Sequence, residues 1–375
     1  MLRWNHLLID PSKPEAFPAG LPDWMEKIKL FCRFWYSGED TWYASTSGST
    51  SAPKIISLSR SAIRASAEKS LKYFCHNPEK EGFALLIPAS SAGGFMLLAR
   101  AFLAEMDVLL LPPSRNAVGQ ASFPEDKKWF LSMLPLQLGD FLGREDALAL
   151  SRNFSGILLG GGELPSDSLH AILSLKCPVY HSYGMTETAS HIAIRKFDSL
   201  SPGPFEPLED FEIRADGNAC LQVKSVLITG NQWLNTHDVA EILPDGRFFI
   251  RGRADFVINS GGLKIHPEVE KNNLSALFPD QLRDFELLGM PDVLLQERMV
   301  IIFFLMSVSR ADIGLITAIF DGINDKEKRK RLPKAVYCIP EGRPVLEGGK
   351  TDFYSLRKKI LEIEPVWEKP NKQHE

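Results

Sequence analysis

The chain has 375 residues, of which 44% are hydrophobic and 24% charged, and its formal net charge is −4. This composition is ordinary for a globular protein, and the length suits two or three domains with cores of their own. The slightly acidic balance argues against a nucleic-acid surface built from bulk positive charge. We therefore expect small molecules rather than nucleic acid as partners.

The cysteines, the N-terminal segment and the apolar runs indicate the cellular compartment in which the protein is expected. Five cysteines are scattered along the chain without a C-x-x-C pair, and an odd number suits a reducing compartment. An Asp and two Pro stand too early in the first 17 residues for a signal peptide. The most apolar run, residues 299–306, is too short to cross a bilayer and predicts a buried strand. We expect a cytoplasmic protein without membrane insertion.

From residue 83 to 184, apolar runs bounded by Pro or Gly alternate with helical patterns. This alternation predicts a mostly parallel sheet covered by helices on both faces, in which ligands bind beyond the carboxyl ends of the strands. The expected strands are 83–88, 107–113, 154–162 and 178–184, and the expected helices are 95–106, 125–138 and 166–175.

The pattern changes after residue 200. Short alternating segments with the turn signals "ADGN" (215–218) and "PDGR" (244–247) predict a β-rich subdomain. After about residue 255, helical and apolar segments mix in a small α+β region. We predict a large domain over 1–254 and a small one over 255–375.

The stretch "TSGSTSAPK" (46–54) combines hydroxyl side chains with glycine, and such a loop can bind phosphate through its backbone N–H groups. Taken alone, it is more typical of an ordinary polar loop. Four further motifs follow in a fixed order: "GGGELP" (160–165), "YGMTETAS" (183–190), the segment 236–270 and "GGKTDF" (348–353). Together the five resemble the adenylate-forming family of acyl-CoA synthetases, peptide-synthetase adenylation domains and luciferases. The resemblance runs from about residue 40 to the end.

The resemblance implies both a fold and a reaction. The fold is α/β, with mostly parallel sheets flanked by helices, a β-rich subdomain, and a small mobile α+β domain at the C-terminus. In the reaction, a carboxylate attacks the α-phosphate of Mg-ATP to give an acyl-adenylate and pyrophosphate. A thiol, commonly that of coenzyme A, then displaces AMP. ATP, Mg²⁺ and coenzyme A are thus the implied cofactor and co-substrates.

The resemblance also implies roles for individual residues. Lys350 would be the catalytic lysine, Thr186 the contact to the α-phosphate, Glu187 the Mg²⁺ ligand and Asp255 the hinge. The implied ATP-binding residues are Thr46, Ser47, Gly48, Ser49, Thr50 and Lys54 at the phosphates, Gly161, Gly162, Glu163, Tyr183 and Gly184 at the adenine, and Asp238 and Arg253 at the ribose. Gly261, Gly262 and Lys264 would lie near coenzyme A.

Within the family, "YGMTETAS" followed by His191, together with "SGGLKIHPEVE", is most similar to the o-succinylbenzoate–CoA ligases of menaquinone synthesis. The acid would then be an aryl dicarboxylate, with one carboxylate activated and the other held by a donor. The candidates for binding the acid are Ser90, Ser91, His181, Ser190, His191 and Arg195, each of which also suits a loop or capping role.

Some positions depart from the family. Ser51 and His237 stand where glycine is usual, and a glycine there would supply a positive φ more easily. Ser91 stands where a histidine or an aromatic residue is common. The phosphate loop begins at residue 46, whereas family members carry a longer segment ahead of it, so we expect the first subdomain to be largely missing. Substrate shielding or formation of a homodimer would then differ.

Two alternatives stay open beside the o-succinylbenzoate ligase. One is an adenylating enzyme for another aryl or acyl acid, which loads coenzyme A or a carrier-protein thiol. The other is a catalytically idle relative that only binds nucleotide. The presence of Glu187, Asp238, Arg253 and Lys350 together argues against the idle relative.

Overall fold

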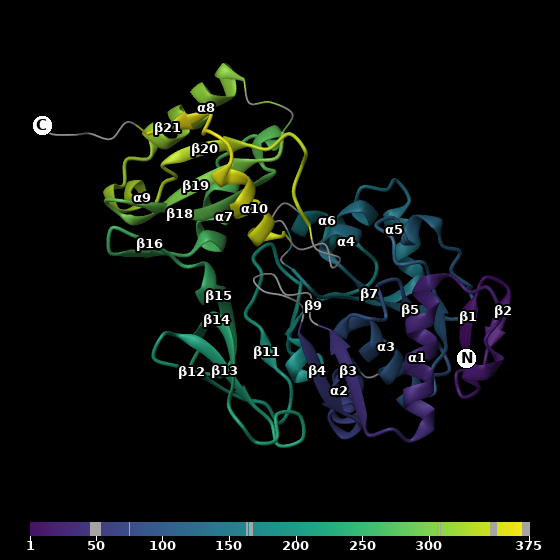
Figure 1. Cartoon of the computed structure of the whole chain (residues 1–375). Helices are drawn as coiled ribbons and strands as arrows, with labels where there is room; N and C mark the ends of the chain where they lie inside the picture. Colours follow the sequence, from purple (N-terminus) through teal and green to yellow (C-terminus); the bar gives the residue numbers. More distant parts are fainter. Residues whose placement is uncertain are drawn as a thin grey trace, which may run out of the picture. The chain divides into compact units, whose positions relative to one another are not determined.

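The structure is a computed structural model that describes residues 1–45, 54–74, 76–162, 164, 168–305, 307, 309–345 and 351–369 (Figure 1). The chain divides into two compact units. The first comprises Met1–Arg214, Gln222–Thr236 and Ile242–Phe249, and the second comprises Ala215–Leu221, His237–Glu241 and Ile250–Glu375. The domain boundary expected after residue 254 stays a prediction, because a division into compact units does not locate a hinge.

The first unit is built on a nine-stranded sheet with the order β11–β10–β9–β8–β7–β5–β6–β1–β2. The six strands from β9 to β1 are parallel to their neighbours, and β10, β11 and β2 pair antiparallel at the two ends. The predicted mostly parallel sheet is therefore confirmed. The strands are β1 (Leu2–Trp4), β2 (Leu7–Ile9), β5 (Glu81–Leu85), β6 (Val108–Leu110), β7 (Lys128–Met133), β8 (Phe154–Leu159), β9 (Val179–Gly184), β10 (His191–Lys196) and β11 (Glu206–Pro207).

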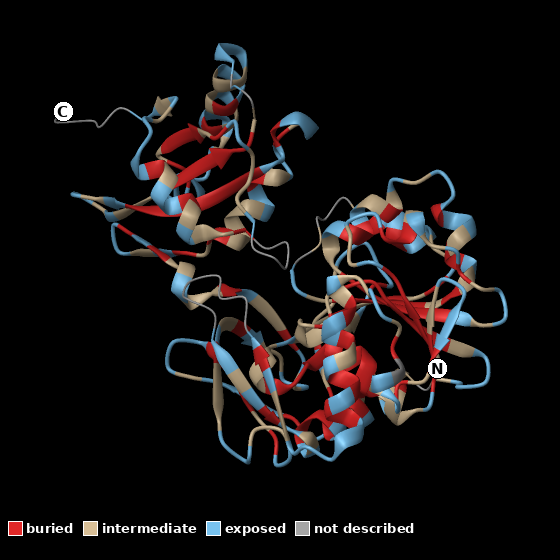
Figure 2. Cartoon of the chain, turned by 45° about the vertical axis from the view of Figure 1, so that its right-hand side comes forward, coloured by how far each residue is buried: buried red, intermediate tan, exposed pale blue. Residues whose placement is uncertain are grey.

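Helices cover both faces of this sheet, and its central strands are buried (Figure 2). Successive side chains of a strand point to opposite faces. Phe83 and Leu85 of β5 accordingly join one apolar cluster, while Ala84 joins the other. The first cluster includes α1 (Asp23–Ser37), α2 (Arg60–Phe74) and α3 (Ala92–Leu103), and the second includes α4 (Pro135–Leu142), α5 (Ala147–Leu150) and α6 (Leu169–Ser174).

The single helix predicted over residues 125–138 is wrong. Residues 128–133 form the parallel strand β7, and α4 begins only at Pro135. Trp129 to Met133 are all buried, as in a strand covered on both faces, so the run lacks the one-sided stripe of a surface helix. Pro135 suits the first turn of a helix, where its missing N–H is not needed.

Two smaller sheets complete the region up to residue 253. β3 (Thr41–Ser45) and β4 (Ile55–Ser59) form an antiparallel pair in which Ser45 lies opposite Ile55. The second sheet has the order β12–β13–β14–β15, and its residues are shared between the two units. Its presence confirms the predicted β-rich subdomain. The strands are β12 (Glu212–Ala215), β13 (Cys220–Lys224), β14 (Leu234–Ile242) and β15 (Phe248–Arg253).

The second unit is α+β, as predicted. Its six-stranded sheet has the order β17–β16–β19–β20–β21, with β18 paired to β19. The apolar run 299–306 supplies most of β19, as expected for a buried strand. The strands are β16 (Ile258–Ser260), β17 (Leu263–Ile265), β18 (Phe285–Asp292), β19 (Gln296–Phe303), β20 (Ala335–Cys338) and β21 (Trp367–Glu368), and the helices are α7 (Pro267–Ser275), α8 (Arg310–Gly322), α9 (Lys326–Lys330) and α10 (Phe353–Leu361).

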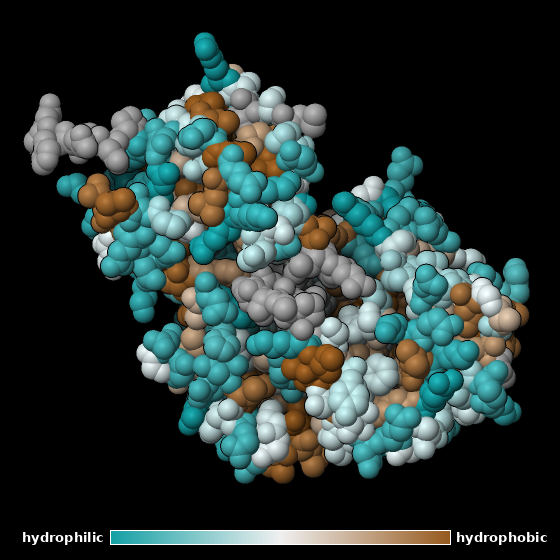
Figure 3. Space-filling view, in the orientation of Figure 1, coloured by the Kyte–Doolittle hydropathy of each residue, from teal (hydrophilic) through white to brown (hydrophobic). Residues whose placement is uncertain are grey.

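Hydrophilic residues predominate on the face of the molecule that Figure 3 shows. On the face shown in Figure 3, hydrophobic residues form small separate areas among hydrophilic ones. Among the residues that the structure describes, no helix is both long and apolar enough to span a membrane.

Candidate active site

The large sheet has a point at which the strand order reverses. The chain runs from β5 to β6 on one side and then returns to β7 on the other side of β5. In open α/β sheets, ligands bind beyond the carboxyl ends of the strands at such a point. The segments that follow β5, β8 and β9 hold Ser90, Ser91, Gly161, Gly162 and Glu187. The structure therefore brings these predicted site residues to one edge of the sheet.

The turn after β8 is held by hydrogen bonds to the two neighbouring strands. The N–H of Gly160 donates to the Met133 carbonyl at 3.2 Å, and the Ser182 hydroxyl donates to the Leu159 carbonyl at 2.7 Å. Gly161 has a φ of +84°, a conformation that residues with a Cβ rarely adopt. The turn therefore needs glycine at this position for a backbone reason.

His181 contacts the far end of the same turn. Its Nε2 lies 2.8 Å from the Gly162 carbonyl oxygen, and its Nδ1 lies 2.9 Å from Nη2 of Arg195. A guanidinium only donates, so Nδ1 accepts and the ring proton is on Nε2, which donates to Gly162. Burial, and next the charge of Arg195, lower the pKa of His181 to about 3. The imidazole is therefore neutral and held in one tautomer.

Tyr183 lies two residues further along β9. Its ring centroid is 5.6 Å from that of Phe205 and 5.4 Å from that of Phe248, so aromatic contacts define its position. Gly184 follows, and a Cβ there would lie 2.2 Å from the carbonyl oxygen of Ser190. Because the backbone of Ser190 and His191 approaches so closely, only glycine fits at this position.

A short 3-10 helix, Thr186–Thr188, carries two of the predicted site residues. The buried hydroxyl of Thr188 lies 2.9 Å from the Met185 carbonyl oxygen and 2.7 Å from that of Ser190, and it accepts the Met185 N–H at 3.1 Å. These contacts fix the segment that presents Thr186 and Glu187.

Glu187 is half-buried and forms no hydrogen bond or ion pair within the described part of the chain. Its carboxylate fits Mg²⁺, which accepts one or two protein carboxylates and completes its octahedron with water and substrate phosphate. The described residues hold no group of three or more His, Cys, Asp or Glu that could bind a metal by themselves. A Mg²⁺ ion here would therefore arrive with the nucleotide.

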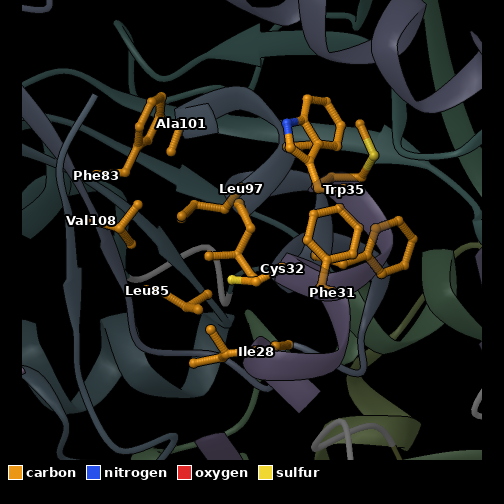
Figure 4. Packing of buried hydrophobic residues seen from close by; sticks show 14 of the residues in the cluster. Ile28, Phe31, Cys32, Trp35, Phe83, Leu85, Leu97, Ala101 and Val108 are labelled. Atoms are coloured by element: carbon orange, nitrogen blue, oxygen red, sulfur yellow. The ribbon is translucent and has the colours of Figure 1, made fainter. Parts of the chain in front are cut away.

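Arg100 is a feature that our reasoning from sequence missed. It lies on α3 and is 2% exposed, and its Nε and Nη1 have no hydrogen-bond partner among the described residues. Its helix neighbours Leu97 and Ala101 lie in the apolar cluster with Ile28 and Cys32 (Figure 4). Burial lowers the pKa of Arg100 to about 10. A buried cation is costly unless an anion accompanies it, so this position favours an anionic ligand. The available signal was one arginine inside the apolar helix 95–106.

The charge of Arg100 also acts on one of a pair of neighbouring acid-binding candidates. Ser190 and His191 are buried, with the Ser190 Oγ 3.3 Å from His191 Nδ1. Burial, and next the positive charge of Arg100, lower the pKa of His191 well below its usual value. The structure thus places a hydroxyl beside an imidazole that the charge of Arg100 helps to keep neutral.

Ser91 is engaged in the fold. Its hydroxyl donates to the Pro88 carbonyl at 2.7 Å and accepts the Gly94 N–H at 3.2 Å, so it caps the N-terminus of α3. Ser90 precedes it and is half-buried.

The second unit holds the predicted ribose and hinge residues. Arg253 Nη1 is 3.5 Å from Asp238 Oδ1, and its Nη2 is 2.8 Å from Asp255 Oδ2. The structure thus brings these three side chains together. Gly261 and Gly262, between β16 and β17, have φ values of +56° and +83°, which agrees with glycine in this turn. They are exposed, as is Lys264 on β17.

Several predicted residues lie outside the described residues. Lys54 is described and exposed at the start of the segment leading into β4. Thr351 is described and buried, directly after the predicted catalytic lysine. The residues outside are Thr46, Ser47, Gly48, Ser49, Thr50, Ser51, Glu163 and Lys350.

Comparison with curated sequences gives one group of named relatives. The 2-succinylbenzoate–CoA ligase of Bacillus cereus is 27% identical over 264 residues, which cover 61% of this chain and 53% of that protein. The same name is carried by a relative from Bacillus anthracis, which is 26% identical over 264 residues. The chain thus spans about half the length of the curated relatives it matches.

Solved structures show the fold. A crystal structure of an acyl-CoA synthetase (AMP-forming)/AMP-acid ligase II-like protein from Dyadobacter fermentans is 25% identical, with a TM-score of 0.59, and the match covers 94% of this chain and 98% of that one. The o-succinylbenzoate CoA synthetase of Bacillus subtilis in complex with its acyl-adenylate is 21% identical, with a TM-score of 0.70, over 86% of this chain and 69% of that one. The AMP-binding enzyme family matches residues 43–214. These residues form a domain of the AMP-binding enzyme family, in a chain with the fold of the adenylate-forming acyl-CoA synthetases.

Proposed function

We propose that the chain is an AMP-forming acid–thiol ligase that activates o-succinylbenzoate and transfers it to coenzyme A in menaquinone biosynthesis. The AMP-binding domain, the adenylate-forming fold and the names of the relatives support this function. A cytoplasmic location would give access to ATP and coenzyme A. Its mass in solution would test for a homodimer.

The buried Arg100 is the observation that carries the choice of acid. An aryl dicarboxylate has one carboxylate that reacts and one that must enter the site as an anion. Arg100 supplies a cation within an apolar helix, and its charge acts on His191, whose ring lies 3.3 Å from the hydroxyl of Ser190. A monocarboxylic acid would leave that cation without a partner.

The remaining residues take roles in two steps. In the first, a carboxylate oxygen of the acid forms a bond to the α-phosphorus of ATP, and pyrophosphate leaves. Tyr183 and the backbone at Gly161 and Gly162 would hold the adenine, and Asp238 and Arg253 the ribose. Thr186 would donate to the α-phosphate, and Glu187 would hold Mg²⁺, which neutralises phosphate charge when bound.

Lys350 would place its positive charge between the attacking carboxylate and the α-phosphate. In the second step, the sulfur of coenzyme A bonds to the acyl carbon, the bond from that carbon to the phosphate oxygen breaks, AMP leaves, and the thiol proton passes to solvent. Gly261, Gly262 and Lys264 would lie along coenzyme A, and Asp255 would be the hinge between the two steps.

The test is pyrophosphate release from ATP with a panel of acids, with and without coenzyme A. We expect turnover with o-succinylbenzoate and formation of its thioester. Arg100→Met should raise the KM for o-succinylbenzoate on the order of 100-fold, because a buried charge pair is lost. The KM for an unsubstituted aryl monocarboxylate should stay unchanged in the same variant.

The same assay separates the alternative functions, because each one predicts a different result. Turnover with aryl monocarboxylates but not with o-succinylbenzoate would contradict the proposed acid and favour a ligase for another aryl acid. Adenylate formation without thioester would point to a carrier-protein thiol as acceptor. Nucleotide binding without turnover of any acid would favour an idle relative.

A further inference from the structure

His181 lies between the two parts of the first unit that are proposed to hold the adenine. On one side, its Nε2–H donates to the Gly162 carbonyl at the end of the turn after β8. Along the strand, it lies two residues before Tyr183, on the same face of β9, because side chains of a strand alternate. It is 4% exposed. The side chain is therefore placed to connect the turn with the tyrosine.

Both ring nitrogens of His181 are already engaged. Nδ1 accepts from Arg195 at 2.9 Å, and Nε2 donates to Gly162 at 2.8 Å. Neither nitrogen is left to bind a carboxylate. Moving the ring to reach a ligand would break both hydrogen bonds and leave buried polar groups unpaired, which is costly. His181 is thus poorly suited to the role of acid ligand that the sequence suggested for it.

The ring of Phe205 contacts His181, Arg195 and Tyr183. The Phe205 ring lies 5.4 Å from the His181 ring, 5.6 Å from the Tyr183 ring and 4.4 Å from the guanidinium carbon of Arg195. A guanidinium over an aromatic face at this distance is an attractive contact. Arg195 therefore fixes the His181 tautomer and also packs on the ring that supports Tyr183.

Within the described part of the chain, three hydrogen bonds hold the turn, and the one from His181 is the last along the sequence. Gly160 is bound to Met133 of β7, and Leu159 is bound to Ser182 of β9. These two hydrogen bonds lie at or before the start of the turn. Only the bond from His181 holds its end at Gly162 among the contacts that the structure describes. Losing it would free the part of the backbone that lies beyond the positive φ of Gly161.

We infer that His181 and Arg195 are positioning residues for the nucleobase: they set the spacing between the Gly161–Gly162 backbone and the Tyr183 ring, and so favour adenine over other bases. This inference rests on the proposed function for the placement of ATP. The sequence suggested both residues as candidates for binding the acid, and this inference assigns them to the nucleobase instead. A fixed slot selects a base by shape and hydrogen bonding, so loosening it should affect discrimination between bases.

The test uses the full chain and measures the Kd of ATP and of GTP by calorimetry, with the KM of ATP and of the acid where turnover is present. In His181→Ala, we expect ATP binding to weaken about tenfold and the preference for ATP over GTP to fall by a similar factor, as expected for one lost hydrogen bond. The KM of the acid should not change. His181→Gln should recover most of the preference, because an amide can accept from Arg195 and donate to Gly162.

His76→Gln is the matched control. His76 is another histidine of the first unit, with a side chain that is 4% exposed and with Nδ1 2.8 Å from a carboxylate oxygen of Glu81. This variant should lower the unfolding temperature without changing the ratio of the two nucleotide affinities. If His181→Ala does not fold, Arg195→Met is measured instead. This variant keeps the imidazole of His181 but removes the group that donates to its Nδ1. It should show a smaller loss of preference in the same direction.

The inference is overturned if a folded His181→Ala keeps the wild-type preference, if its effect falls on the acid's KM alone, or if the replacement Arg195→Met keeps the preference. It is also overturned if the wild-type chain shows no preference for ATP. If the wild-type chain binds ATP selectively but turns over no acid, the proposed function fails. The binding measurements on the variants then still decide the role of His181 and Arg195.

Discussion

His237 has a left-handed backbone conformation, which is unfavourable for a residue with a Cβ. The sequence predicted strain there, because glycine is usual at this position, and the structure gives His237 a φ of +60°. For a residue with a Cβ, the left-handed region is less favourable than the usual regions by roughly 1 kcal/mol. The chain therefore retains a strained residue directly before Asp238.

Replacing His237 by glycine should raise the free energy of unfolding by about 0.5 kcal/mol, since relief of strain outweighs the added freedom of the unfolded chain. Urea denaturation measures the change. His237→Ala is the control, because it removes the imidazole but keeps the Cβ and hence the strain. Equal stability of the glycine and alanine variants would contradict the explanation.

Residues differ in how far sequence predicts their role. Glycines at a close approach or a positive φ, such as Gly161 and Gly184, belong to motifs and were found there. Arg100 was missed, because a charge within an apolar helix does not reveal whether an anion accompanies it. Ser91 and His181 were candidates for binding the acid that also suited a loop or capping role, and the three-dimensional contacts show that Ser91 caps a helix and His181 binds a backbone carbonyl.

At the scale of elements, the strand β18 carries a buried carboxylate that joins several parts of the second unit. Glu286 is 6% exposed and accepts the Thr351 hydroxyl at 2.9 Å. It also pairs with Lys271 of α7 at 2.8 Å and with Arg343 at 3.2 Å. Thr351 immediately follows Lys350 in the chain, so this cluster fixes the residue next to the proposed catalytic lysine.

Glu286→Ala should lower the free energy of unfolding by roughly 3 kcal/mol, because it leaves a buried hydroxyl and two cations without their common partner. Chemical denaturation followed by circular dichroism gives the value. Glu327→Ala serves for comparison, since Glu327 forms an exposed pair with Lys330 and should cost less than about 0.5 kcal/mol. Similar losses in the two variants would mean that the Glu286 cluster contributes little.

Elements were predicted best where their pattern was unambiguous. The alternation of apolar strands and helices was sufficient for the parallel sheet. It failed at residues 125–138, where a strand buried on both faces is followed after one residue by a helix. Since such a strand lacks polar alternation, periodicity alone does not separate it from a helix.

At the scale of the whole molecule, the proposed reaction uses residues of both units. Thr186 and Glu187 belong to the first unit, while Asp238, Arg253 and the position of Lys350 belong to the second. An enzyme of this kind would need the second unit in one arrangement for adenylation and in another for thiol transfer. Asp255 is the proposed hinge for this change of arrangement.

Lys350→Ala should slow adenylation by a factor on the order of 100 or more, because a charge that stabilises the transition state is lost. Thiolysis of supplied acyl-adenylate should be spared. Pyrophosphate release and thioester formation, followed separately in single-turnover experiments, measure the two steps. Lys358→Ala, at an exposed position of α10, should leave both steps unchanged. A parallel loss of both steps in Lys350→Ala would argue against two arrangements.

Among the described residues, no side chain pairs with the buried Arg100, and this has a practical consequence for finding the acid. A buried cation without an anion destabilises the empty protein, and a bound carboxylate removes that cost. Any ligand that prefers the folded chain raises its melting temperature by mass action. Thermal shift with a series of dicarboxylates would therefore rank candidate acids in the absence of ATP, before any turnover assay exists.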